Sequence, residues 1–142
     1  MRDDEMKFPW HGNLSNIPRT WGNEECWGTS VEGVHGKFLN IRAGESTSLK
    51  YYKIKDETLV ILAGHVRVTY YGEFCNPADP HLPDTEPYVT DLKTNSVFCI
   101  PSGCTYRIEA VTDSRLIEVG NHWHDPAVKV VSRLGKVDEK VP

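Results

Sequence analysis

Short segments in which apolar and polar residues alternate are the feature that most constrains the fold of this chain. Because successive side chains of a β-strand point to opposite faces of a sheet, such alternation predicts half-buried strands. The expected strands, two of them short and apolar, cover residues 37–42, 47–54, 58–71 with a break at Gly64, 95–100, 106–110, 115–119 and 128–131. No window of the sequence repeats apolar residues at helical spacing over three turns. The pattern therefore predicts an all-β sandwich or barrel.

Two regions lack this alternation. Residues 1–18 show neither a strand period nor a helix period, so they predict an irregular N-terminal arm. Trp10, Trp21 and Trp27 lie in or near it, and such large apolar side chains are rarely left exposed. We therefore expect the arm to pack on the barrel or on a second subunit, as in a homodimer. Residues 72–94 contain four prolines and predict a long loop, which we interpret as an insertion.

The length of 142 residues fits a single domain that buries a core without disulfides or metals. We place this domain at residues 19–135, followed by a charged tail at 136–142. The formal net charge of −4 is spread along the chain, which argues against a nucleic-acid partner. The longest apolar run, residues 59–63, is too short to cross a bilayer, and no signal-peptide pattern is found. We expect a cytoplasmic protein that binds neither nucleic acid nor membrane.

The four cysteines are Cys26, Cys75, Cys99 and Cys104. In a chain of this size without an export signal, thiols usually remain reduced. The spacing of Cys99 and Cys104 differs from the short pairs that bind zinc. We interpret all four as free thiols.

A spaced set of residues runs from Gly44 to Gly64, with Lys50, Tyr52 and Glu57 between them. This spacing resembles the first motif of the cupins. That motif reads Gly, five residues, His-x-His, three or four residues, Glu, six residues, Gly, and its His and Glu side chains hold a metal inside a barrel. Here lysine stands in place of the first histidine and tyrosine in place of the second.

The second cupin motif has its counterpart from Asn95 to Ala110, through Pro101, Gly103 and Tyr106. Again the turn residues match and the metal-binding histidine does not. Within the cupins, residues 19–135 are most similar to small domains related to mannose-6-phosphate isomerase. The resemblance implies a jelly-roll barrel, also called a double-stranded β-helix.

In that family the metal is held by Gln or His, His, Glu and His, at positions that correspond here to Lys50, Tyr52, Glu57 and Tyr106. A charged lysine has no lone pair, and neutral tyrosine is a poor ligand for zinc or ferrous iron. Glu57 alone is retained, and one carboxylate does not hold a catalytic metal. The resemblance therefore implies a barrel without metal or other cofactor.

We expect Lys50 and Glu57 to form the functional centre, with the ammonium in the place of the missing cation and paired with the carboxylate. Tyr52 and Tyr106 would hydrogen-bond this pair and contact the ligand. The alternative is structural, with Lys50 extending to the barrel mouth and both tyrosines filling the space of the lost histidines.

Three functions follow from the resemblance. The first is binding of a sugar phosphate or similar small polar ligand in the barrel without metal. The second is a sugar-phosphate isomerase or epimerase, in which Lys50 polarises a carbonyl and Glu57 is the base, or in which a different metal set uses His65 or the pair His122 and His124. The third is a structural or regulatory protein whose barrel is closed by its own aromatic side chains.

Overall fold

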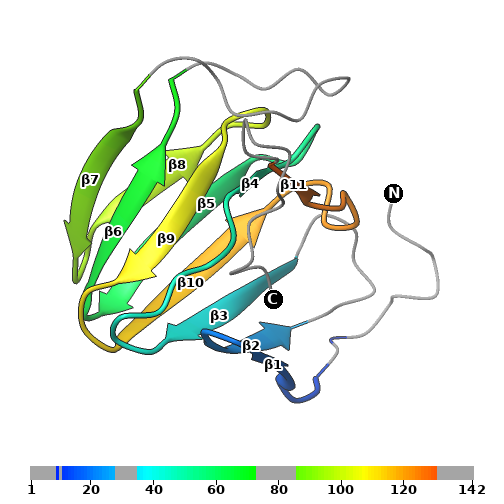
Figure 1. Ribbon diagram of the computed structural model, residues 1–142. Helices are drawn as coiled ribbons and strands as arrows, with labels where there is room; N and C mark the ends of the chain where they lie inside the picture. Colours follow the sequence, from blue (N-terminus) through cyan, green and yellow to red (C-terminus); the bar gives the residue numbers. More distant parts are fainter. Residues whose placement is uncertain (1–8, 10, 28–34, 73–85, 131–142) are drawn as a thin grey trace.

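The computed structural model describes residues 9, 11–27, 35–72 and 86–130. These residues form β-strands and no helix (Figure 1). The strands are β1 (Ser15–Arg19), β2 (Gly22–Trp27), β3 (His35–Ile41), β4 (Lys50–Tyr51), β5 (Glu57–Ala63), β6 (His65–Tyr70), β7 (Tyr88–Lys93), β8 (Val97–Ile100), β9 (Tyr106–Ala110), β10 (Ser114–Gly120) and β11 (Val128–Lys129).

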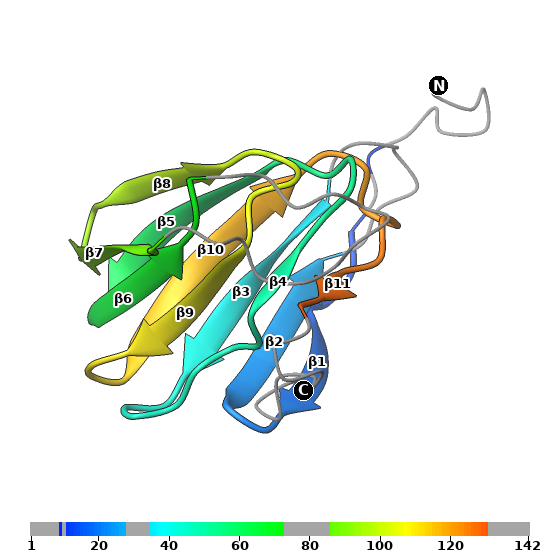
Figure 2. The ribbon, with the colours of Figure 1, turned by 45° about the horizontal axis from the view of Figure 1, so that its top comes forward.

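The strands form two antiparallel sheets, one with the order β1-β2-β3-β10-β5-β8 and the other with the order β11-β4-β9-β6-β7. The sheets face each other, as the two views in Figures 1 and 2 show. Strand β10 lies between β3 and β5, so that segments far apart in the sequence are hydrogen-bonded neighbours. This arrangement is a jelly roll, and the all-β prediction is confirmed.

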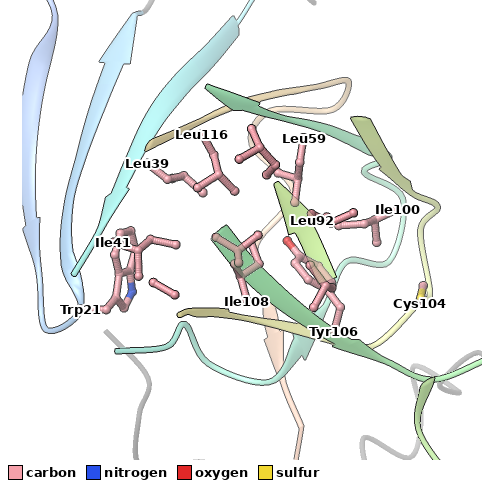
Figure 3. Close-up of a cluster of buried hydrophobic side chains, with 14 residues drawn as sticks. Trp21, Leu39, Ile41, Leu59, Leu92, Ile100, Cys104, Tyr106, Ile108 and Leu116 are labelled. Atoms are coloured by element: carbon pink, nitrogen blue, oxygen red, sulfur yellow. The ribbon is translucent and has the colours of Figure 1, made fainter. Parts of the chain in front are cut away.

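The core fills the space between the sheets (Figure 3). It is built from the residues of each strand that point between the sheets. Among them, Leu59 and Ile61 of β5, Val66 and Val68 of β6, and Leu116 of β10 are 0% exposed. Burying one such side chain stabilises the fold by about 1.5–3 kcal/mol. The alternation seen in the sequence therefore corresponds to the two faces of each sheet.

Gly64 ends β5 and allows the chain to enter β6 in the opposite sheet. Its φ angle of 99° lies in the left-handed region. A Cβ atom at this position would overlap with Ser114 Oγ and with the Asp113 carbonyl oxygen. The break predicted at Gly64 is confirmed, and the structure shows why a larger residue does not fit there.

Three strand assignments from the sequence need correction. Ser15–Arg19, most of which was assigned to an irregular arm, is strand β1 and pairs with β2. Tyr88–Lys93, assigned to the long loop, is strand β7 and pairs with β6. Both are edge strands that are largely exposed, so neither shows a clear apolar period. In the expected strand 47–54, only Lys50–Tyr51 is β-structure.

Several predictions concern residues outside the described ranges, among them Trp10, Cys75, the middle of the long loop and the tail 136–142. Cys26 and Cys99 are free thiols, and the Cys104 thiol donates a hydrogen bond of 3.5 Å to the Tyr71 carbonyl. The described part of the chain has no helix of the length and apolarity needed to span a bilayer.

Strands β4 and β11 form the end of the five-stranded sheet. Lys50 is directly opposite Lys129, and Tyr51 is opposite Val128. A small second core of Leu49, Tyr51 and Val130 lies beneath them. The backbone amide of Val130 donates a hydrogen bond of 3.1 Å to the Leu49 carbonyl. These contacts attach the C-terminal strand to the barrel.

Candidate functional site

A cavity of about 220 Å³ opens inside the barrel beside β4 and β11. This volume corresponds to roughly seven water molecules at about 30 Å³ each. Most of the side chains that line the cavity are polar, and the charged ones are Arg19, Glu24, Lys37, Lys50, Glu118 and Lys129. The cavity is therefore suited to a small polar ligand rather than to an apolar one.

Strand pairing explains why Lys50 lies in the wall of this cavity. Lys50 is opposite Tyr106 of β9 on one side and opposite Lys129 of β11 on the other. Residues directly opposite in an antiparallel pair have side chains on the same face, so all three line the cavity. Lys50 is half-buried, and its Nζ lies 4.9 Å from the centre of the Tyr106 ring.

Along one wall of the cavity and just behind it, acidic and basic side chains alternate in a connected cluster. Glu118 Oε2 lies 3.3 Å from Lys55 Nζ and 3.7 Å from Lys37 Nζ. Lys55 Nζ also lies 3.5 Å from Glu57 Oε2. On the other side, Lys37 pairs with Glu24 at 2.5 Å, and Glu24 pairs with Arg19 at 2.9 Å. We call these six residues, Arg19, Glu24, Lys37, Lys55, Glu57 and Glu118, the charge cluster.

Glu57 and Glu118 are two buried carboxyl groups that share one proton at neutral pH. Burial, and then the charge of Glu118, raise the pKa of Glu57 to about 8. Burial also tends to raise the pKa of Glu118, but the charges of Lys37 and Lys55 outweigh it and lower that pKa to about 2. The proton therefore resides on Glu57, which hydrogen-bonds Glu118.

The structure corrects the expected pair of Lys50 and Glu57. In the described residues no carboxylate oxygen lies within 4.0 Å of Lys50 Nζ, and the cation beside Glu57 is Lys55. Lys50 Nζ lies over the Tyr106 ring instead, and the Tyr106 hydroxyl is the group that reaches Glu57 from the five-stranded sheet. Glu57 also has a fully buried side chain and does not line the cavity, whereas Glu118 does.

The two tyrosines hold different parts of the site. Tyr106 Oη donates a hydrogen bond of 2.6 Å to Glu57 Oε1, a contact of the kind expected for it, and Figure 3 shows the side chain directed into the barrel. Tyr52 lies beneath Lys55, with Nζ 4.5 Å from its ring centre. Burial, followed by the charge of Glu57, raises the pKa of both hydroxyls, so both remain protonated.

Sequence reasoning missed five of the residues that build this site: Arg19, Glu24, Lys37, Lys55 and Glu118. The sequence did indicate Glu118, since it lies two residues after Leu116 in the same strand and therefore faces the barrel interior as Leu116 does. Lys37 likewise shares one face of its strand with Leu39 and Ile41. A charged residue on the apolar face of a predicted strand therefore indicates a residue that lines the barrel interior.

The donor set does not fit the metal that cupin motifs imply. Two protonated tyrosines, a lysine and a protonated Glu57 stand where the ligands would be. Among the described residues, no three His, Cys, Asp or Glu side chains come together in a way that could hold a metal. His65 contacts Asp91 at 3.1 Å, whereas the His124 ring lies 6.3 Å from that of His35.

Comparisons with known proteins support the class of fold. No protein-family model and no curated protein sequence matches the chain. Among solved structures, it is similar to the capsular polysaccharide assembling protein CapF from Staphylococcus aureus, with a TM-score of 0.66 and 16% identity over 82% of this chain and 34% of that one.

Two further structures share the fold. Oxalate decarboxylase from Bacillus subtilis has a TM-score of 0.61 and 17% identity over 76% of this chain and 27% of that one. The cupin domain of Drosophila melanogaster CENP-C has a TM-score of 0.60 and 14% identity over 76% of this chain and 75% of that one. The chain spans about a third of the length of CapF. At sequence identities of 14–17%, the structural similarity to these proteins shows the fold alone, which is a cupin jelly roll.

Proposed function

We propose that this protein binds a small anionic molecule, a sugar phosphate or a similar polar metabolite, in its barrel cavity without a metal. The observation that carries the proposal is Lys50. Its ammonium lies in the cavity wall, directly opposite the second lysine Lys129. Two like charges directly opposite each other in a sheet are destabilising unless an anion compensates them.

The charge cluster forms no direct ion pair with Lys50 or Lys129 in the described part of the chain. Glu118 is engaged by Lys37 and Lys55, and Glu24 is engaged by Arg19 and Lys37. Glu57 holds a proton at neutral pH. In the described part of the chain, neither Lys50 nor Lys129 has a carboxylate oxygen within 4.0 Å. A ligand with a phosphate or carboxylate group would provide the missing charge.

The size and polarity of the cavity support a small ligand. Pockets for drug-sized molecules measure roughly 300–1,000 Å³, and this cavity of about 220 Å³ is smaller. The Thr47, Ser48 and Tyr52 side chains in its wall provide hydrogen-bonding groups suited to sugar hydroxyls. The sequence resemblance to mannose-6-phosphate isomerase domains and the fold likeness to a capsular polysaccharide assembling protein favour a carbohydrate.

Calorimetric titration with mannose 6-phosphate, mannose and inorganic phosphate tests the proposal. We expect both phosphate compounds to bind and mannose not to bind. Lys50→Met should weaken binding at least about tenfold, since a lost contact with an ionised group costs about 1.5–3 kcal/mol. Lys53→Met, an exposed lysine three residues away, is the matched control and should bind like the wild type. Equal affinity of Lys50→Met and wild type would contradict the proposal.

The isomerase or epimerase function is a second candidate, favoured by the carboxyl pair at the base of the cavity. Groups with displaced pKa values next to a cavity are typical of proton-transfer sites. Glu118 rather than Glu57 would be the base, because Glu118 is ionised and lines the cavity. Incorporation of deuterium from D₂O into a sugar phosphate, lost in Glu118→Gln, would support this candidate. Absence of exchange with bound ligand would exclude it for that ligand.

The third expected function, a barrel closed by its own aromatic side chains, is not supported. Lys50, Tyr52 and Tyr106 line a cavity of about 220 Å³ that their side chains leave open.

A further inference from the structure

Among the described residues, Lys50 has no carboxylate oxygen within 4.0 Å of its amine, whereas the neighbouring Lys37 and Lys55 are both ion-paired. Lys37 contacts Glu24 and Glu118, and Lys55 contacts Glu57 and Glu118. Within the described residues, Lys50 Nζ instead lies over the face of the Tyr106 ring, in the wall of the cavity. A molecule entering the cavity would meet this nitrogen without having to displace an ion pair.

We propose that Lys50 is a nucleophilic amine that forms a reversible imine with the carbonyl carbon of an anionic ligand, such as a 2-oxo acid or an aldehyde phosphate. The proposal rests on the anion-binding function proposed above and specifies its ligand class. Lys129, exposed at the edge of the same cavity, would hold the phosphate or carboxylate group while Lys50 reacts with the carbonyl.

The nucleophile is the neutral amine in equilibrium with the ammonium that binds the anion, because an ammonium has no lone pair. Burial lowers the pKa of Lys50, and the positive charge of Lys37 acts in the same direction. The negative charge of Glu118, and that of Glu57 once it ionises, oppose this effect without cancelling it. Lysines with a pKa lowered by burial are the ones that form Schiff bases in proteins.

The reaction balances without a further reagent. The nitrogen lone pair attacks the carbonyl carbon, and proton transfer from nitrogen to oxygen gives a carbinolamine. The carbon–oxygen bond then breaks, and the oxygen leaves as water with both amine hydrogens, so that a neutral imine remains. If the imine takes up a proton from solvent, the resulting cation lies over the Tyr106 ring, where a cation–π contact stabilises it by about 0.5–2 kcal/mol.

Reductive trapping tests the proposal. The full chain is incubated with pyruvate or glyceraldehyde 3-phosphate in the presence of sodium cyanoborohydride and then analysed by intact mass and peptide mapping. We expect one principal adduct, located on Lys50, with labelling of Lys50 at least about tenfold above that of the exposed Lys53. For pyruvate the added mass is that of pyruvate less one oxygen atom. Glycerol 3-phosphate, which has the anion but no carbonyl, should reduce labelling by competition.

Lys50→Arg separates this inference from the proposed function. Arginine keeps the positive charge, so inorganic phosphate should still bind, but its guanidinium does not form the imine and the adduct should be lost. Because the adduct site is mapped in the wild type, the test does not depend on the folding of any variant.

Each outcome decides between the two proposals. A Lys50 adduct that is absent from Lys50→Arg supports the imine. Phosphate binding with no Lys50 adduct, or labelling spread evenly over exposed lysines, overturns the imine and leaves anion binding in place. Absence of both phosphate binding and adduct overturns both.

Discussion

At the scale of single residues, the site depends on where one proton resides. Glu57 and Glu118 are both buried, yet Glu57 is neutral and Glu118 is ionised. The reason is that Lys37 and Lys55 both contact Glu118, whereas Lys55 is the lysine that contacts Glu57 among the described residues. A carboxyl group kept neutral in this way donates a hydrogen bond, as an amide would. The arrangement therefore makes stability depend on pH.

Glu57→Gln should remove part of that dependence. The folded-state pKa of Glu57, about 8, is above its ordinary value of 4.5, so its contribution is full below pH 4.5 and is lost as the pH rises toward 8. We expect the free energy of unfolding of the wild type to fall between pH 5 and pH 8 by on the order of 1–3 kcal/mol more than that of the variant. Urea unfolding across this range measures it. The control Glu45→Gln, at an exposed carboxyl outside the cluster, should retain the wild-type slope.

Tyr106→Phe tests the hydrogen bond to Glu57. The hydroxyl donates at 2.6 Å to a buried oxygen, and leaving such an acceptor unpaired costs about 1–3 kcal/mol. We expect urea unfolding to show a loss in this range at pH 6. Tyr88→Phe removes a hydroxyl from a side chain that is 60% exposed and should change stability by less than about 0.5 kcal/mol. Equal losses in the two variants would show that the buried bond contributes nothing specific.

The candidate site was only partly predictable at this scale. Spacing identified Lys50, Tyr52, Glu57 and Tyr106, and three of them line the cavity. Their partners were not predictable, because a motif fixes positions along the chain but not which sheet each strand joins. Lys55, two residues before Glu57, is the lysine that pairs with it, and the spacing of the motif does not predict this contact.

At the scale of elements, the fold was largely predictable wherever a strand has one buried face. Residues 106–110 and the break at Gly64 agree with the structure, since alternation and a turn glycine both have local causes. Strands β1, β2 and β7 were not found: β1 and β7 are largely exposed edge strands, and in β2 only Glu24 is buried, so none of them shows an apolar period. Strand β4 is short because its neighbours pair with only two residues of it.

Gly64→Ala should be more harmful than Gly44→Ala. Both glycines have positive φ, so each alanine costs on the order of 1 kcal/mol in backbone strain. At Gly44 a Cβ atom meets no atom within 4 Å, whereas at Gly64 it meets Ser114 Oγ and the Asp113 carbonyl. We expect the Gly64 variant to lose at least about 1 kcal/mol more, measured by thermal or urea unfolding. A Gly44 variant that is equally or more destabilised would contradict this reading of the β5–β6 turn.

At the scale of the whole molecule, the barrel keeps the cupin architecture while a charge cluster occupies the region where the motif implies a metal. The hydrogen bond from Tyr106 of β9 to Glu57 of β5 joins this cluster to the five-stranded sheet, and Lys55 Nζ lies over the Tyr52 ring. Stability should therefore respond to anions and not to chelators.

Melting curves with and without EDTA and phosphate test this expectation. EDTA should leave the melting temperature unchanged, because the residues at the motif positions are poor metal ligands. Phosphate at about one hundred times its Kd should add about 2.7 kcal/mol to the free energy of unfolding. Stoichiometric metal in the purified protein, with a melting temperature that falls in EDTA, would contradict the metal-free site.

Strand β11 gives the anion site a consequence for the C-terminal side of the chain. The strand has two residues, and one of them, Lys129, lines the cavity opposite Lys50. A ligand held by both lysines would link ligand occupancy to the attachment of β11, and this linkage is reciprocal. Exchange of the Val130 amide hydrogen with solvent, which requires its bond to Leu49 to open, should then slow when the cavity is filled. The exchange rate at Val130 would then show whether the cavity holds a ligand.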